Sequence, residues 1–312
     1  MPDRKSHLDG LAITSLVLCC FLWGLNQVAV KAALPEIPAL WQAAARSVGG
    51  ALLVWGWSAW RGVALFGRDG TGRAGLLAGL LFGAEFACIF LGLEYTSASR
   101  MVVFLYLAPF VVALGMPFIS RAERLAPVQA IGLVIAFASV ASAFAEGFSQ
   151  PAVGPRQWIG DALGLMAGAL WGATTLVVRA STLSQAAAEK TLLYQLGVSG
   201  VVLALAAASS AAPLPLSLSP LAAGSMAFQV VVISFASYLV WFWLVRSYPA
   251  TRLSAATMLT PIFGLLLGAW LLDEPITPRL LAALAGVAAG IYLVNRTAGA
   301  QARMRETSDV VE

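Results

Sequence analysis

The stretch Trp23-Gly24-Leu25-Asn26-Gln27-Val28-Ala29-Val30-Lys31 lies in the first long apolar run of the chain, and parts of it recur. Its Trp-Gly pair has a counterpart in Trp171-Gly172, 148 positions later. Lys31 has a counterpart in Arg179 at the same separation. We therefore predict that the chain holds two copies of one unit of about 150 residues.

A second pattern supports this relation between the halves. Arg100 precedes Pro109 by nine positions, and Arg252 precedes Pro261 by nine positions, 152 residues further along. The apolar runs between these positions suggest five spans in each unit. Because five is odd, the second unit must enter the membrane upside down relative to the first.

The composition limits the possible functions. Of 312 residues, 60% are apolar and 11% are charged, against roughly a quarter charged in a soluble domain. This excludes a soluble enzyme, a nucleic-acid-binding domain and a disordered regulator. The cysteines Cys19, Cys20 and Cys88 all lie in apolar runs, which argues against a disulfide scaffold or a metal cluster. We expect no cofactor.

A helix needs about 20 residues to cross about 30 Å of hydrocarbon, so we predict an all-α protein with ten transmembrane helices around a central cavity. The expected spans are roughly 11–32, 38–60, 74–94, 98–118, 127–146, 159–178, 191–210, 222–245, 252–272 and 279–296. A Gly- and Pro-containing linker at 147–158 separates an N-terminal repeat (1–146) from a C-terminal repeat (159–296). A polar, mobile cytoplasmic tail is expected at 297–312.

The distribution of Lys and Arg predicts the orientation. With a cytoplasmic N-terminus, the opposite side holds four of the 19 basic residues, Lys31, Arg100, Arg156 and Arg279. Arg46 lies within a span, and the other 14 are cytoplasmic. Cytoplasmic loops carry an excess of Lys and Arg, so we expect both termini in the cytoplasm and the protein in the inner membrane.

Inverted repeats around a site at the membrane midplane are typical of secondary transporters. The basic residues obey the inversion, since the 61–73 loop carries three Arg and its counterpart at 211–221 carries none. The alternative is an inert helical bundle that arose by gene duplication. A non-transporting membrane scaffold therefore remains a second hypothesis.

These motifs resemble the drug/metabolite transporter superfamily, in its ten-helix EamA family. The stretch from Trp23 to Lys31 is similar to the family's Trp-Gly-x-Asn opening. The second signature, small residues followed by a Pro and a helix-terminal Glu, occurs as Thr96-Ser97-Ala98-Ser99…Pro109…Glu123-Arg124-Leu125 and as Ala250-Thr251…Pro261…Glu274. The resemblance covers nearly the whole chain. It implies small-molecule movement, commonly export of amino acids or metabolites, with the YddG-like aromatic amino-acid exporters as a neighbouring type.

Two ionisable residues lie deep within the predicted spans, Arg46 in the second and Glu85 in the third. From the helical rise, they lie about 12 Å and about 13 Å below the same membrane boundary. A lone charge at mid-membrane costs at least about 3 kcal/mol, so we expect both to face the interior, paired or bridged by water or substrate. In the functional interpretation, Arg46 binds the carboxylate of a zwitterion and Glu85 binds its ammonium group or a proton. In the structural interpretation, the two form an ion pair that locks two helices.

Aromatic and uncharged polar residues in the spans complete the candidate substrate site, because ligand sites are mostly apolar with a few polar anchors. The aromatic candidates are Trp23, Tyr106, Trp171, Tyr238 and Trp241, and the polar candidates are Asn26, Gln42 and Thr174. The alternatives are that the aromatic rings anchor helices at the headgroups, as we expect for Trp55, Trp57, Trp60 and Trp270, and that the polar groups join helices by hydrogen bonds.

Proline lacks an amide hydrogen and clashes inside a helix. Pro109 and Pro261 should therefore kink or break spans 4 and 9, and they are our candidate hinges. Plain kinks without functional motion are the alternative. Glycines recur every four positions at 75/79/83, 160/164/168/172, 264/268 and 286/290, which predicts close helix packing.

The sequence lacks the residues that ATP binding and intramembrane proteolysis require. None of the three lysines follows a Gly, so the chain holds no P-loop for ATP. No span contains a His, which argues against an intramembrane zinc or serine protease. The sequence therefore favours a non-enzymatic secondary transporter that exports amino acids or related metabolites by alternating access, with a multidrug or cation exporter as the nearest alternative. The expected partners are the lipid bilayer and a small-molecule substrate, and a monomer is favoured over a dimer.

Overall fold

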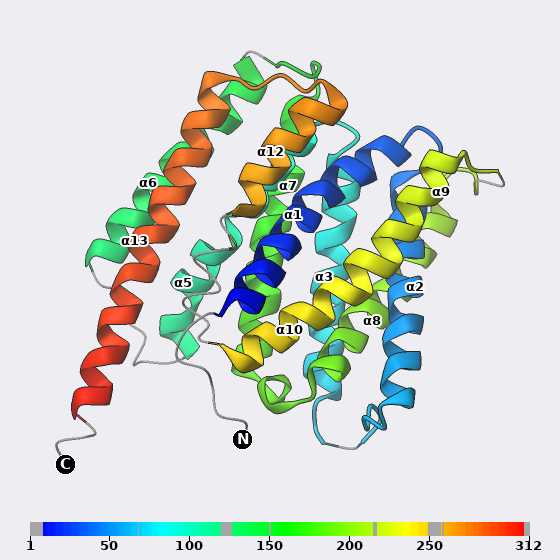
Figure 1. Ribbon diagram of the computed structural model, residues 1–312. Coiled ribbons are helices and arrows are strands. Elements are labelled where there is room, and N and C mark those ends of the chain that lie inside the picture. Colours follow the sequence, from blue (N-terminus) through cyan, green and yellow to red (C-terminus); the bar gives the residue numbers. More distant parts are fainter. Residues whose placement is uncertain are drawn as a thin grey trace.

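The computed structural model describes residues 9–67, 69–119, 127–149, 151–214, 217–248, 257 and 259–308. Every regular element in these ranges is a helix, and the long helices lie side by side in one bundle (Figure 1). Six positions of the predicted signatures lie outside the described residues, namely Glu123, Arg124, Leu125, Ala250, Thr251 and Arg252.

The helices follow the predicted order of spans. The first repeat contains α1 (Gly10–Ala33), α2 (Ala39–Trp60), α3 (Gly72–Gly92), α4 (Ala98–Leu105), α5 (Ala108–Ile119) and α6 (Pro127–Ser149). The second repeat contains α7 (Gln157–Ala180), the 3-10 helix η1 (Thr182–Gln185), α8 (Ala188–Ser209), α9 (Pro220–Ala227), the π-helix η2 (Phe228–Ser237), α10 (Tyr238–Ser247), α12 (Leu259–Leu272) and α13 (Pro278–Ser308).

Length and composition make these helices membrane spans. Seven helical stretches of the described chain are long and apolar enough to cross a bilayer, with α4 and α5 counted as one stretch and α9 joined to η2 and α10. Two shorter apolar helices, Leu259–Leu272 and Pro278–Leu293, follow. The tenth span is α2, whose 22 residues have the required length but include the polar Gln42 and Arg46. The chain is thus an all-α, multi-pass membrane protein with ten spans.

The last helix continues into the predicted cytoplasmic tail. α13 does not end at the predicted boundary near residue 296 but runs on to Ser308. The segment from 297 to 308 contains three alanines and several Arg, Gln, Met and Glu, all of which favour the helix, and the single Gly299 does not end it.

The contacts between helices show the twofold relation of the repeats. In the first repeat α1 packs against α12, and its counterpart α7 packs against α4 and α5. In the same way, α3 packs against α7 while η2 and α9 pack against α1. The pairs α2 with α8 and α6 with α13 each join a helix to its own counterpart, as a pseudo-twofold axis requires. Figure 1 shows α6 and α13 side by side.

The repeated Trp-Gly pair marks equivalent close crossings in the two repeats. A Cβ placed on Gly24 of α1 would lie 2.7 Å from the backbone nitrogen of Gly264 in α12. A Cβ on Gly172 of α7 would lie 2.6 Å from Cβ of Val111 in α5. Because any larger side chain would push these helices apart, glycine allows the close backbone approach that the spacing predicted.

Span 4 is broken near its proline. The half-helix α4 ends at Leu105, Tyr106 and Leu107 form a turn, and α5 begins at Ala108. Pro109 is therefore the second residue of α5, where a missing N–H costs little. In span 9, Pro261 is the third residue of α12, so both prolines lie in the first turn of the helix that follows them.

Candidate functional site

The most buried cation of the bundle is Arg46, in the middle of α2. Its side chain has no exposed surface, and its Nη2 donates a hydrogen bond of 3.1 Å to the hydroxyl of Tyr238 in α10. The guanidinium carbon lies 3.9 Å from the centre of the Phe86 ring in α3. Nε and Nη1 have no hydrogen-bond partner. A buried guanidinium with unused donors is suited to bind an anion, because it presents a planar fork to a carboxylate.

Glu85 lies next to Phe86 on α3 and is 5% exposed. It is within electrostatic range of Arg46 and of Tyr238. No direct ion pair joins Arg46 to Glu85 among the ion pairs of the described residues. Oε2 of Glu85 has no hydrogen-bond partner. Arg46 and Glu85 therefore both keep side-chain atoms without a hydrogen-bond partner, and these atoms can bind a third group.

Two further aromatic side chains predicted for the site, Trp23 and Trp241, meet near the start of α10, the helix that carries Tyr238. The rings of Trp23 in α1 and Trp241 in α10 meet edge to face, with centroids 5.4 Å apart. Nε1 of Trp23 donates a hydrogen bond of 3.0 Å to Oγ of Ser237, the residue before Tyr238. We call Trp23, Arg46, Glu85, Tyr238 and Trp241 the Arg46 cluster. It draws residues from both repeats, namely from α1, α2 and α3 of the first and α10 of the second.

A π-helix positions the second-repeat side of the cluster. The segment η2 ends at Ser237, and α10 begins at Tyr238. π-Helical turns are rare and occur often at functional sites. Ser237 donates to the carbonyl of Ile233 at 2.7 Å and so keeps its oxygen fixed as the acceptor for Trp23. The sequence analysis missed this element, because nothing in its apolar sequence separates a π-helix from an α-helix.

Tyr106 and Trp171 form a separate pair. Their ring centroids are 6.1 Å apart at an interplanar angle of 85°, and Tyr106 donates a hydrogen bond of 2.5 Å to the carbonyl of Thr257. Tyr106 is buried, whereas Trp171 is 39% exposed. Thr174, one turn from Trp171, donates to the carbonyl of Leu170 in its own helix. None of these described contacts reaches the Arg46 cluster.

Gln42 and Asn26 differ in their surroundings. Nε2 of Gln42 donates to the carbonyls of Val30 and Ile37, and its Oε1 accepts a hydrogen bond of 2.6 Å from Gln229. This arrangement fits the structural interpretation, in which a polar group joins helices. Asn26 is 5% exposed, and its Oδ1 has no partner, so it keeps an acceptor for a ligand.

A group of buried charges that the sequence analysis did not recognise lies where α3 ends and α4 begins. Arg100 of α4 binds Asp161 of α7 through Nε at 3.1 Å and Nη2 at 2.7 Å, and binds Glu146 of α6 through Nη1 at 2.9 Å. Glu274 accepts hydrogen bonds from the first residues of α4. Arg100 and Glu274 were part of the repeat pattern, but only the fold shows their partners.

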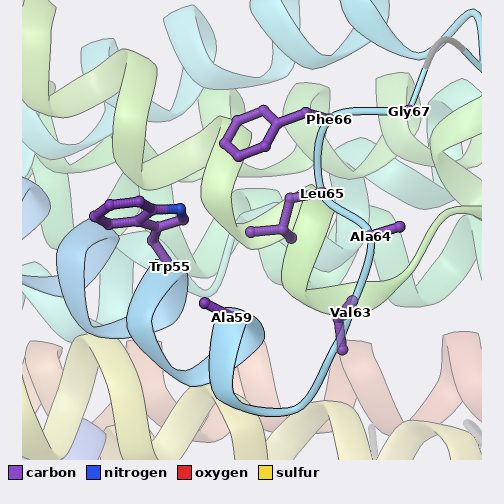
Figure 2. A pocket seen from close by; sticks show the side chains of 7 residues that line it. All are labelled: Trp55, Ala59, Val63, Ala64, Leu65, Phe66 and Gly67. Carbon is purple, nitrogen blue, oxygen red and sulfur yellow. The ribbon is translucent and has the colours of Figure 1, made fainter.

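A cavity of about 390 Å³ lies at the end of α2 rather than at the centre of the bundle (Figure 2). Its lining is apolar and consists of Trp55, Ala59, Val63, Ala64, Leu65, Phe66 and Gly67. Figure 2 shows the rings of Trp55 and Phe66 on the same side of the loop. The lining of this cavity contains no charged side chain, so the cavity lacks the charged groups that would bind a zwitterion. The predicted central cavity remains a prediction.

The loop beside this cavity is held by Lys190 of α8. Its Nζ donates to the carbonyl of Gly67 at 3.0 Å and to Asp69 at 2.7 Å. Thr71 donates to the other carboxylate oxygen of Asp69 at 2.6 Å. The hydrogen bond from Lys190, followed by that from Thr71, holds the pKa of Asp69 well below its usual range.

The described residues offer no metal site. No group of three His, Cys, Asp or Glu side chains among them is placed to hold a metal ion. Cys19, Cys20 and Cys88 are buried and form no disulfide.

Comparisons with known proteins agree with this architecture. The model of the EamA-like transporter family matches residues 10–145 and again residues 158–296. The chain is 27% identical over 288 residues to the uncharacterized transporter YvbV of Bacillus subtilis (strain 168), with 92% of each protein covered. It is 24% identical over 298 residues to an uncharacterized transporter of Archaeoglobus fulgidus, with 93% of this chain and 97% of that protein covered.

The fold also resembles a solved structure. A protein of known crystal structure superposes with a TM-score of 0.62 at 19% identity, and the match covers 91% of this chain and 94% of that one. At this identity the likeness concerns the fold alone. The family model covers both repeats and hence most of the chain. The chain therefore belongs to the EamA-like transporter family.

Proposed function

We propose that this protein is a secondary transporter that exports amino acids, with aromatic ones among them, or related small metabolites across the bacterial inner membrane. It works by alternating access of the Arg46 cluster to the two sides. The observation that supports this most directly is the wholly buried Arg46, whose Nε and Nη1 lack partners. Such donors are costly to bury unless a ligand uses them.

In this proposal the two charges of the cluster divide the ligand between them. Arg46 takes the carboxylate, and Glu85 takes the ammonium group or a proton. Trp23, Tyr238 and Trp241 provide aromatic surface beside the charges, and Asn26 adds an acceptor. Gln42 joins helices, Thr174 bonds within its own helix, and Tyr106 and Trp171, one from each repeat, line the substrate path away from the cluster.

The energy for transport must come from the gradient of a solute or an ion, since the sequence carries no P-loop that would bind ATP. The excess of Lys and Arg in the predicted cytoplasmic segments supports an orientation with both termini in the cytoplasm. The proposed working unit is a monomer without enzymatic activity, because the Arg46 cluster is complete within one chain.

A multidrug or cation exporter is the second candidate. The unpartnered Oε2 of Glu85 beside aromatic rings favours it, because aromatic and acidic groups together suit organic cations. In this case Arg46 serves to balance the charge of Glu85 and does not contact the substrate.

Counterflow in proteoliposomes tests both functions. The protein is reconstituted with an internal aromatic amino acid, and uptake is measured for three labelled analogues of one compound. These are the zwitterion, its N-acetyl form, which keeps only the carboxylate, and its amide, which keeps only the ammonium group. The proposal expects fastest exchange of the zwitterion, whereas exchange of the amide alone supports the cation exporter. Absence of flux for every candidate solute supports the scaffold.

A further inference from the structure

We propose that Glu274 and the ion pairs of Arg100 hold the first turn of α4, and that α4 swings as one rigid lever when they release it, carrying Tyr106 with it. We call Ser99, Arg100, Glu146, Asp161 and Glu274 the α4 clamp. The inference rests on the proposed alternating access, and it assigns positioning roles to residues outside the Arg46 cluster.

Glu274 caps α4 from the other repeat. It follows α12, and its Oε1 accepts a hydrogen bond of 2.7 Å from the backbone N–H of Ala98. Its Oε2 accepts from the backbone N–H of Ser99 at 2.9 Å and from the Ser99 hydroxyl at 2.7 Å. The first N–H groups of a helix have no partner inside the helix, and a carboxylate there is favoured by the helix dipole. Ser97 supplies the ordinary cap from the same chain segment by accepting from the N–H of Arg100.

Arg100 fixes the same turn of α4 from the opposite direction. Its guanidinium forms a two-pronged pair with Asp161 of the second repeat and a single bond with Glu146 of the first. All three residues are buried, with at most 5% of their surface exposed. Thr277, from the second repeat, donates to the Glu146 oxygen that also binds Arg100. The clamp thus joins the repeats by several charge-assisted bonds, which are strong when made and costly when one partner alone remains buried.

The helix between the clamp and Tyr106, α4, is short and rigid. Every residue of α4, from Ala98 to Leu105, is buried. Its eight residues extend about 12 Å at the usual helical rise, and Tyr106 follows directly. Tyr106 touches Trp171 of the second repeat, and the break at Tyr106 and Leu107 separates α4 from α5. Movement at the clamp is therefore transmitted along α4 to Tyr106, after which the chain turns into α5.

The second repeat cannot move away from the first at this end without breaking the clamp. Asp161, Glu274 and Thr277 belong to the second repeat, whereas their partners belong to the first. Buried ion pairs and caps are either made or broken, so the clamp has two states rather than a continuum. It closes this side of the bundle when made and permits access when broken.

Hydrogen exchange in lipid nanodiscs tests the lever without any substrate. Deuterium uptake of the amides in 98–105 is measured by mass spectrometry for the wild type, for Glu274→Gln and for the milder Ser99→Ala. We expect uptake to rise at least threefold in Glu274→Gln, evenly from the first turn to Leu105, and to rise less in Ser99→Ala. A rise in deuterium uptake that is confined to the first turn of α4 shows only fraying of the helix end, and it contradicts the proposal that α4 moves as a rigid unit. Unchanged uptake contradicts the proposal as well.

Glu36→Gln is the matched control. Glu36 accepts hydrogen bonds from the backbone N–H and the hydroxyl of Ser219, the cap residue of α9, at 2.7 and 2.6 Å. It joins the repeats with the same chemistry but lies on the surface, so we expect uptake in α4 to stay at the wild-type level. Transport gives a second readout, in which Glu274→Gln changes kcat at least threefold while KM stays within twofold. A wild type without flux overturns the proposed function and leaves the exchange result to decide the lever.

Discussion

Arg46 in the first repeat donates a hydrogen bond of 3.1 Å to the hydroxyl of Tyr238 in the second. The most buried cation of the bundle is thus held by both halves of the chain. This bond leaves two guanidinium nitrogens of Arg46 without a partner, and it joins α2 to α10, the helix that also carries Trp241. A movement of one repeat against the other would act directly on the residue that we propose as the carboxylate anchor.

Replacement of Arg46 tests the anchor. Arg46→Lys keeps the charge but removes the planar fork, and we expect kcat/KM for amino acids to fall about 10- to 100-fold, because a hydrogen bond to a charged group contributes about 1.5–3 kcal/mol. Arg46→Gln should cause a larger loss. Initial rates of counterflow over a range of substrate concentrations give KM and kcat/KM for each variant. Wild-type KM in Arg46→Gln would show that this residue does not bind the substrate.

Removal of the hydroxyl of Tyr238 tests the bond between the repeats. Tyr238→Phe leaves Arg46 without its one described hydrogen-bond acceptor, so we expect a loss of about 1.5–3 kcal/mol in the free energy of unfolding. Denaturant unfolding in detergent measures it. Trp243→Phe, in the same helix but 40% exposed, serves as the control and should change stability by less than about 0.5 kcal/mol. Equal stability of wild type and Tyr238→Phe would mean that the bond contributes nothing to folding.

The charge of Glu85 can be tested with the same solute series. In Glu85→Gln we expect exchange of the zwitterion to fall at least about tenfold, which corresponds to 1.4 kcal/mol. Exchange of the N-acetyl form, which lacks the ammonium group, should stay unchanged. Unaltered transport of the zwitterion would remove Glu85 from the mechanism. If exchange of both the zwitterion and the N-acetyl form were lost, Glu85 would instead support the position of Arg46.

The repeated Trp-Gly pair gives a test of the packing. Gly172→Ala forces a Cβ to within 2.6 Å of Val111, so we expect a loss of about 1–3 kcal/mol in stability. Gly197→Ala in α8 is the matched control, because a Cβ there meets nothing within 4 Å. Thermal unfolding in one detergent compares the two variants. Similar melting temperatures for both would contradict the close crossing of α7 and α5.

The loop beside the α2 cavity should respond to acid. Because the pKa of Asp69 lies below its usual range in the folded protein, its bond to Lys190 stabilises the loop above about pH 4. This contribution is lost only as the pH falls through the lowered pKa, so the loop should stay protected at pH 5. Asp69→Asn should be unprotected at both pH 5 and pH 7. Proteolysis or hydrogen exchange of residues 61–71 measures this, and a wild-type loop that opens between pH 7 and pH 5 would contradict it.

The sequence by itself determined the helical class, the order of the spans and the two inverted units, because these follow from the length of apolar runs and from an odd number of spans per repeat. It also predicted Trp23, Arg46, Glu85, Tyr238 and Trp241 as candidate site residues, since charged, polar and aromatic groups are rare in an apolar background. It placed the break of span 4 near Pro109, because proline acts through its own backbone. The helix that extends into the predicted tail, to Ser308, was not part of this prediction; the residues there favour a helix although they are polar.

Only the tertiary structure decided which of these residues meet. Gln42 and Thr174 have the same composition signal as Asn26, yet their polar groups are used within and between helices, whereas the Oδ1 of Asn26 has no partner. The π-helix that precedes Tyr238 and the partners of Arg100 and Glu274 were not predictable. These depend on contacts between residues far apart in the chain, such as Glu274 with Ser99, and a single sequence records each residue but not its distance to the others.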